Sequence, residues 1–231
     1  MKILIGGDSW GMGEWEWKED VKKYKLNHKG LEQYFIEDGH EVTNVSSAGT
    51  SNLHSLHDLI VETDKQNYNY CFWFQSDEIR DLRPYNFFEK NITSYDELIK
   101  QSDIQLEIVY RFIAIKCKVP VYIIGGCSKV KTNIIDKSYK NIIPFIPSVT
   151  EFLLKNYKHP DVWCSDWINN ISKDFKDIDK LLEQKKIQDN LALEPLFIPD
   201  GGHPNRYAIK KLYDYICSEL SIQSNIFKRA K

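Results

Sequence analysis

The sequence predicts an α/β fold with a mostly parallel central sheet and helices on both faces. Short apolar runs alternate with amphipathic helical stretches along the chain, so that helical segments separate the strands. Consecutive parallel strands need such helical crossovers. The length of 231 residues fits one α/β domain with a full core, and we expect a single domain over residues 1–231.

The strands are predicted from short runs of apolar, β-branched or aromatic residues bounded by polar residues or glycine. The first ends at Gly6-Gly7, which is typical of a tight turn, and the fourth ends at Gly125-Gly126. Four runs meet these criteria and a shorter fifth is a weaker candidate: 2–5, 41–45, 68–74, 120–124 and 196–198.

The helices are predicted from apolar residues that recur every three or four positions. Gly39 is a plausible stop for the first helix, and Ser94 begins a Ser-x-x-Glu capping box with Glu97 before the longest one. A further helix, over 167–185, is strongly charged on one side. The amphipathic stretches are 29–38, 53–63, 95–116 and 206–220.

Residues 130–165 are the least regular part of the chain and contain Pro144, Pro147 and Pro160. Proline removes a backbone donor and disfavours helix interiors and central strands. We therefore expect an irregular insertion here that serves as a lid or as an interface.

Composition excludes several classes of protein. The formal net charge of −2, without a long basic run, argues against nucleic-acid binding by bulk electrostatics. No apolar stretch is long enough to span a membrane, and the apolar start is too short for a signal peptide, so we expect a cytoplasmic protein. The five cysteines, an odd number without CxxC spacing, match neither a disulfide framework nor a zinc site. We expect no metal and no cofactor.

Two motifs bracket the chain. Gly6-Gly7-Asp8-Ser9 follows the first strand, where glycines allow a sharp bend that presents the serine hydroxyl at the rim of the sheet. Asp200-Gly201-Gly202-His203 precedes the last helix, and its carboxylate can reach one imidazole nitrogen while the other faces outward. Each motif alone is more often a turn or a structural histidine. Together they supply a nucleophile, a general base and an orienting acid for acyl transfer.

These residues resemble the SGNH (GDSL-type) hydrolases. The matching segments are Gly7-Asp8-Ser9, the stretch 47–52 after the second strand, and the stretch 200–205. They occur in the family's order, although most of the sequence between them does not match. The resemblance implies a three-layer flavodoxin-like fold and ester or related acyl hydrolysis without a metal.

The resemblance also implies roles for individual residues. Ser9 would be the nucleophile, His203 the base and Asp200 its orienting partner. The backbone N–H groups of Ser9 and Gly49 would donate hydrogen bonds to the oxyanion.

The sequence departs from the family pattern after the third strand. There the family has an Asn whose side-chain amide is an oxyanion donor, and in simple register this chain has Asp77. An ionised Asp about 4 Å from the oxyanion would cost on the order of 4 kcal/mol. Either Asp77 points away or the site is a poor hydrolase. The amides of Gln75 and Asn52 are candidates to replace the missing donor. Arg80 is a candidate to neutralise Asp77 or Glu78.

Trp10, Trp15 and Trp17 follow the nucleophile closely. Trp10 and Trp15 are candidates to stack on a sugar ring or to shield an acyl chain, and packing of this loop against the domain is the alternative.

The sequence thus predicts a serine esterase or deacylase that acts on a small-molecule or glycan ester, with an O-acylated carbohydrate as the most plausible substrate. Two alternatives stay open. One is an SGNH-fold binding or structural module with weak or no chemistry; the other is an acyltransferase. The sequence does not predict an oligomeric state.

Overall fold

A computed structural model describes residues 1–81, 92–126, 128–155, 157, 175–198 and 202–224. Its centre is a five-stranded sheet with the order β4-β1-β5-β6-β7, and every pairing is parallel. When only the five strands of this sheet are numbered along the chain, their order is 2-1-3-4-5. This is the strand order of flavodoxin-like folds, and it confirms the predicted fold class. The strands are β1 (Lys2–Gly7), β4 (Glu41–Asn44), β5 (Tyr70–Gln75), β6 (Val121–Gly125) and β7 (Ile142–Ile146).

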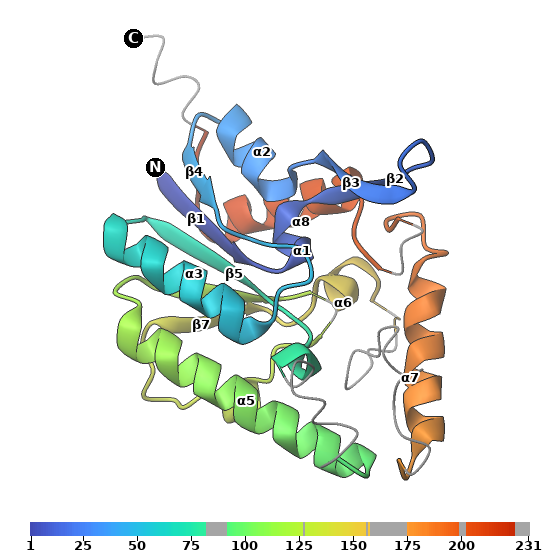
Figure 1. Cartoon of the computed structure of the whole chain (residues 1–231). Coiled ribbons are helices and arrows are strands. Elements are labelled where there is room, and N and C mark those ends of the chain that lie inside the picture. The colour runs from blue at the N-terminus through green and yellow to red at the C-terminus, as the bar shows by residue number, and fades with distance from the viewer. Residues whose placement is uncertain (82–91, 127, 156, 158–174, 199–201, 225–231) are drawn as a thin grey trace, which may run out of the picture.

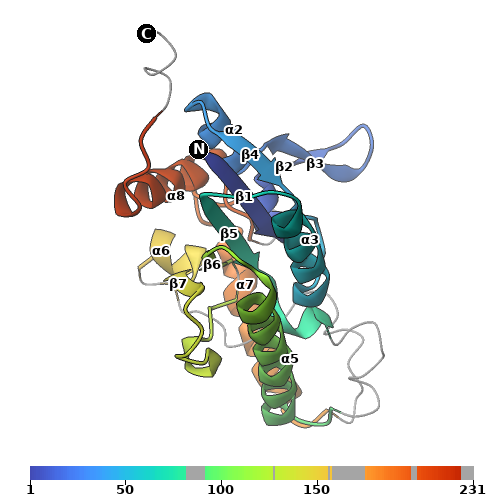
Figure 2. The same cartoon turned by 90° about the vertical axis from the view of Figure 1, so that its left-hand side faces the viewer.

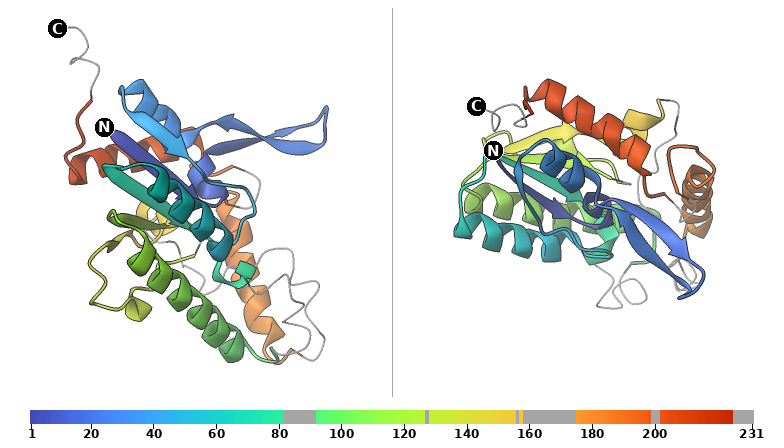
Figure 3. Two further views of the ribbon diagram at one scale, coloured as in Figure 1. Left: turned by 60° about the vertical axis from the view of Figure 1, so that its left-hand side comes forward. Right: turned by 90° about the horizontal axis from the view of Figure 1, so that it is seen from above.

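Helices cover both faces of the sheet, as the views in Figures 1 and 3 show. On one face lie α2 (Gly30–Glu37) and α8 (Arg206–Glu219); on the other lie α3 (Asn52–Lys65) and α5 (Tyr95–Lys116). The alternation of side chains along β1 divides the core accordingly. Ile3 and Ile5 join the α2–α8 cluster, whereas Leu4 joins the α3–α5 cluster.

The four helices begin and end close to where the sequence predicts. Side chains cap three of them: Ser51 accepts from the His54 N–H in α3, Ser94 from Glu97 in α5, and Asn205 from Ala208 in α8. Half of the predicted capping box is present: the Ser94 hydroxyl accepts from the Glu97 N–H, but the Glu97 carboxylate accepts from the Thr93 N–H, one residue before the cap.

The structure contains an antiparallel hairpin that the sequence does not predict, formed by β2 (Glu14–Lys18) and β3 (Lys23–His28). It projects from the domain directly after α1 (Ser9–Met12), as Figure 2 shows. Trp15 and Trp17 pair across the strands with Leu26 and Tyr24, so the apolar residues share one face. The base of the hairpin is tied to α8, because the Glu14 carboxylate lies 2.7 Å from the Arg206 Nε.

The expectation that residues 130–165 are irregular is wrong for part of this stretch. It contains a short 3₁₀ turn, η3 (Thr132–Ile134), followed by strand β7 and then by helix α6 (Val149–Leu153). Pro144 is tolerated in β7 because that strand is at the edge of the sheet, where one side of the backbone needs no ladder hydrogen bond. Residues 156 and 158–165 lie outside the described residues, so a lid or an interface stays a prediction.

Two further expectations differ from the structure. The charged helix is α7 (Ile178–Leu191), shifted from the predicted 167–185, whose first part lies outside the described residues. The expected last strand, 196–198, forms only an isolated bridge between Phe197 and Pro204. Among the helices that the structure describes, none is long and apolar enough to cross a bilayer.

Gly7, at the end of β1, brings the chain unusually close to β5. Its φ is +123°, and a Cβ atom there would lie 2.2 Å from the Phe74 carbonyl oxygen. Gly49 also has a positive φ, +71°, but a Cβ there would meet nothing within 4 Å. Substitutions at these two glycines therefore separate the energetic cost of backbone strain from that of steric overlap.

We expect Gly7→Ala to lower the free energy of unfolding by about 3 kcal/mol or more, because strain and overlap with backbone atoms add. Gly49→Ala, the control, should cost only about 1–2 kcal/mol for the left-handed conformation. Urea unfolding followed by circular dichroism measures both values. Equal losses in the two variants would contradict the close approach at Gly7.

Candidate active site

The candidate site lies at the carboxyl edge of the sheet, where ligands bind in open α/β folds. Asp8 follows β1 and caps α1, because its Oδ1 accepts from the Trp10 N–H at 3.0 Å. Ser9 is the first residue of α1 and is buried, with 5% of its surface exposed. The sharp turn after β1 thus places the serine at the rim, as expected.

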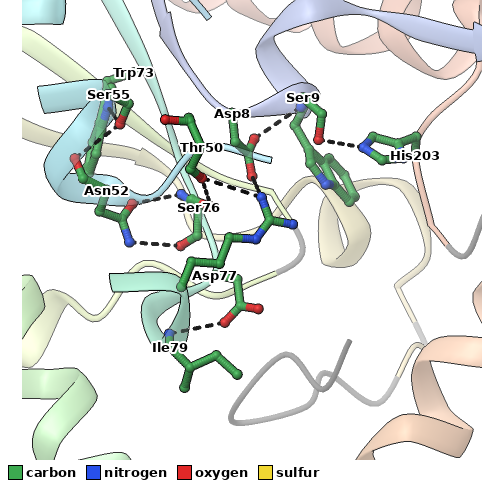
Figure 4. A network of polar contacts seen from close by, with 12 residues as sticks. Asp8, Ser9, Thr50, Asn52, Ser55, Trp73, Ser76, Asp77, Ile79 and His203 are labelled. Atoms are coloured by element: carbon green, nitrogen blue, oxygen red, sulfur yellow. Dashed lines mark hydrogen bonds and ion pairs between the residues drawn. The ribbon is translucent and has the colours of Figure 1, made fainter. Parts of the chain in front are cut away.

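His203 meets Ser9 there, although 194 positions separate them in the chain (Figure 4). The His203 Nε2 lies 2.6 Å from the Ser9 Oγ. The His203 carbonyl accepts from the Ile198 N–H at 2.9 Å, and Asn205, two residues later, is the N-cap of α8, so the histidine backbone is held on both sides. In the tautomer that carries its proton on Nδ1, the imidazole accepts the serine hydroxyl hydrogen and is placed to remove it.

Asp200, the expected third member, lies outside the described residues. The structure therefore neither places its carboxylate against His203 nor separates them. Asp8 is buried next to the nucleophile, and its charge is close enough to interact with His203. Burial raises the pKa of Asp8, and the Arg80 charge opposes that rise.

Gly49 belongs to the loop that follows β4, and this loop lies against the end of β1. The Ser47 N–H donates to the Gly7 carbonyl at 3.0 Å. An open groove of about 410 Å³ runs along the loop, lined by the continuous stretch 47–51, His54 and Arg80. Gly49 is thus at the surface of a groove, where its backbone is accessible.

Asn52 and Gln75, the residues expected to replace the missing oxyanion amide, are engaged elsewhere. The Asn52 amide donates to the Ser76 carbonyl at 3.2 Å, and its Oδ1 accepts from the Ser76 N–H at 2.8 Å. The Gln75 amide donates to the Lys129 carbonyl, and its Oε1 accepts from the Tyr110 hydroxyl at 2.6 Å. Both side chains are completely buried, so the expectation that they face the oxyanion is wrong.

Asp77 does not oppose the site. Its Oδ1 accepts from the Ile79 N–H at 3.1 Å and so caps the 3₁₀ turn η1 (Glu78–Asp81). Figure 4 shows this carboxylate on the far side of the polar network from Ser9. Of the two outcomes considered for Asp77, the structure has the one in which it points away.

The two tryptophans expected to contact substrate differ in their surroundings. Trp10 is 3% exposed and packs under His203, with ring centroids 5.9 Å apart, and against Phe197. As a core residue it is not placed to stack on a sugar, and that expectation is wrong. Trp15 is partly exposed, and its ring centroid lies 6.3 Å from that of His203. Its indole N–H donates to the Ser9 carbonyl at 3.4 Å.

The described cysteines are unsuited to act as a rival nucleophile. Cys71 and Cys117 are buried in the core, and Cys217 is partly buried in α8. Burial raises the pKa of Cys71 well above its ordinary value, raises the pKa of Cys117 to about 11, and also raises the pKa of Cys217. Cys127 lies outside the described residues. In the part of the chain that the structure describes, no three metal-ligating side chains come together.

Asp81 was not singled out from the sequence, yet it holds the start of α3 beside the groove. Its Oδ1 accepts from the Leu53 N–H at 2.9 Å, which satisfies a donor in the first turn of the helix. Burial raises the pKa of Asp81, and the hydrogen bonds from Ser51, Leu53 and Asn52 oppose that rise. The folded state therefore favours the neutral carboxyl.

This pKa shift predicts the sign of a pH dependence. The stabilisation from a raised carboxyl pKa is fully present below the unfolded value of about 3.9 and is lost as the pH rises through the folded value. We expect Asp81→Asn, which keeps the oxygen acceptor, to remove that loss. Urea titrations between about pH 3 and pH 7 should show wild type losing stability relative to the variant.

Asp136→Asn is the control, because the hydrogen bonds from Ser138 lower the pKa of the exposed Asp136 carboxyl. Its effect should have the opposite sign: wild type gains stability relative to this variant as the pH rises. A difference between wild type and Asp81→Asn that does not change with pH would contradict the raised pKa of Asp81.

A scan against protein-family models finds none that matches the chain, and a search of curated proteins finds no relative. Solved structures are similar over nearly the whole chain. One is a carbohydrate acetylesterase family member from Sinorhizobium meliloti, with 8% identity, a TM-score of 0.46, and coverage of 96% of this chain and 99% of that one.

Two others are similar to the same degree. The psychrotrophic esterase EstA from a Pseudoalteromonas species has 14% identity and a TM-score of 0.43, and the match covers 95% of this chain and 98% of that one. The lipase/acylhydrolase from Enterococcus faecalis has 13% identity and a TM-score of 0.41, with 95% and 94% covered.

Proposed function

We propose that this chain is a serine esterase of the SGNH type, with Ser9 as nucleophile and His203 as general base. The observation that carries the proposal is the 2.6 Å contact between the Ser9 Oγ and the His203 Nε2 at the carboxyl edge of a flavodoxin-like sheet. A serine hydroxyl is a weak nucleophile until a base accepts its proton, and this geometry supplies that base.

The reaction proceeds in two halves. Ser9 Oγ bonds to the ester carbonyl carbon while its proton moves to His203 Nε2, and the alcohol leaves with that proton when the tetrahedral intermediate collapses. A water molecule then gives a proton to His203 and attacks the acyl-Ser9, which releases the acid and restores the hydroxyl. Asp200 would orient the imidazole by accepting its Nδ1–H, and the N–H groups of Ser9 and Gly49 would bind the oxyanion.

The proposed substrate is an ester of a small molecule or a glycan, such as an O-acylated sugar. Trp15 supports this choice, because its partly exposed ring lies beside His203 at the base of the hairpin. Farther along the same face, Trp17 is 42% and Tyr24 39% exposed, and their ring centroids are 5.2 Å apart. A sugar ring can stack on such exposed aromatic faces.

We expect wild type to react with a fluorophosphonate probe and to hydrolyse a short-chain nitrophenyl ester. Ser9→Ala should abolish labelling and lower kcat about a thousandfold or more, and His203→Ala should lower it to a similar degree. Mass spectrometry of the labelled peptide identifies the modified residue.

Ser138→Ala, at an exposed position, is the matched control and should retain labelling and turnover. Wild type that neither labels nor hydrolyses the ester at high protein concentration would favour a binding or structural module instead. If a sugar acceptor diverts the acyl group from water in the product analysis, the chain is an acyltransferase.

We expect Trp15→Ala to raise KM about fivefold for an acetylated methyl glycoside, since an aromatic contact contributes on the order of 1 kcal/mol. The KM for methyl acetate, which has no ring to stack, should change little. Steady-state kinetics on both esters test this, with Phe112→Ala, at an exposed position of α5, as the control. An equal change for the two esters would argue against stacking on Trp15.

A further inference from the structure

Arg80 joins the two backbone segments that border the candidate site. It lies in η1, one short turn beyond β5, and its side chain is 15% exposed. Its Nη1 lies 3.6 Å from the Asp8 Oδ2 and 3.4 Å from the Thr50 carbonyl oxygen. Asp8 directly precedes Ser9, and Thr50 directly follows Gly49, so one guanidinium group spans both segments.

The neighbours of Arg80 show that this bridge is part of a buried polar network (Figure 4). The Ser76 hydroxyl also donates to the Thr50 carbonyl, at 3.0 Å, and the Ser76 backbone is held by Asn52. Asp8 is 3% exposed, and its other carboxylate oxygen accepts from the Trp10 N–H. The guanidinium therefore has a defined position set by its partners.

The amides that sequence analysis considered as oxyanion donors are engaged elsewhere, whereas Arg80 lines the groove together with Gly49. Asp77 is turned towards Ile79 and contributes no amide. Within the stretch 76–81 that directly follows β5, Arg80 is the basic residue at the edge where an acyl-transfer intermediate would become negative, and the Asp8 carboxylate shares its charge. Charge that is already oriented stabilises such an intermediate without reorganisation.

We propose that Arg80 is a positioning residue for the oxyanion site: it holds the Gly49 segment against the Ser9 turn and supplies positive charge in place of the amide donor. This inference rests on the proposed esterase function. From the sequence, Arg80 is expected only to neutralise Asp77 or Glu78, so this role is an additional one.

The test compares Arg80→Gln and Arg80→Lys with wild type in steady-state kinetics. We expect Arg80→Gln to lower kcat about a hundredfold with KM changed less than about threefold, as for the loss of an oxyanion contact. Arg80→Lys, which keeps the charge but not the planar fork, should recover part of the loss. Arg111→Gln, on the exposed side of α5, is the matched control and should leave kcat unchanged.

A purely structural role is distinguished by chemical rescue. Added guanidinium at millimolar concentration should raise the kcat of Arg80→Ala and leave that of wild type and Arg111→Gln unaltered. A kcat of Arg80→Gln within threefold of wild type overturns the inference. So does a loss that guanidinium does not rescue and that Arg80→Lys does not reduce, because the residue would then only support the fold.

Removal of Arg80 leaves the Asp8 carboxylate buried beside fewer partners, so Arg80→Gln is also made in an Asp8→Asn background in case the single variant does not fold. The folded double variant should still turn over about a hundredfold more slowly than Asp8→Asn alone. Equal kcat values for these two proteins would overturn the inference.

The two proposals fail in different ways. If wild type shows no turnover and no Ser9 labelling, the esterase proposal itself fails. If wild type is active and the Arg80 variants are equally active, the inference about Arg80 fails and the esterase proposal stands.

Discussion

The two hydrogen bonds between the Asn52 side chain and the Ser76 backbone are the contact on which the candidate site depends. Asn52 begins α3 and Ser76 follows β5, so this pair closes the carboxyl edge of the sheet between neighbouring elements. Ser76 has no solvent-exposed surface, and a buried backbone donor or acceptor left without a partner would cost on the order of 1–3 kcal/mol. The position of Ser76 in turn directs its hydroxyl to Thr50, and the loop that carries Gly49 is held in place.

The central architecture could be predicted from the sequence because its signals are local and repeat. The run at 2–5 is entirely apolar after Lys2, and the stripe over 95–116 has a cap at its start, so both elements are found where they were expected. Edge strand β7 was missed because a proline inside a run argues against a central strand, and only the strand order reveals that this one is at the edge. The hairpin is not predicted, because the sequence after Ser9 indicates a tryptophan-containing loop, whereas residues 14–18 pair with residues 23–28.

Of the candidate site, the sequence predicts which backbone segments meet but not how their side chains are oriented. The approach of Ser9 to His203 followed from two motifs at opposite ends of a parallel fold, because topology brings the end of the first strand and the start of the last helix together. The orientation of Asn52, Gln75 and Trp10 did not follow, since each side chain turns inward to satisfy or fill a neighbour that is distant in sequence. Arg80 belongs to the same group: its position depends on Asp8 and Thr50, which the sequence does not place beside it.

The separation of 194 positions between Ser9 and His203 also has a consequence for synthesis. The ribosome makes the serine 194 residues before the imidazole, and β4, β5, β6 and β7 are made between them. A contact of such long range forms late in folding, because the chain between the two groups must lose its conformational freedom first. During translation the hydroxyl is thus present without the imidazole, and an intact contact between the two reports that the sheet and α8 have assembled. Chemical reactivity at Ser9 would therefore serve as a sensor of complete folding in a cell extract, without purification of the protein.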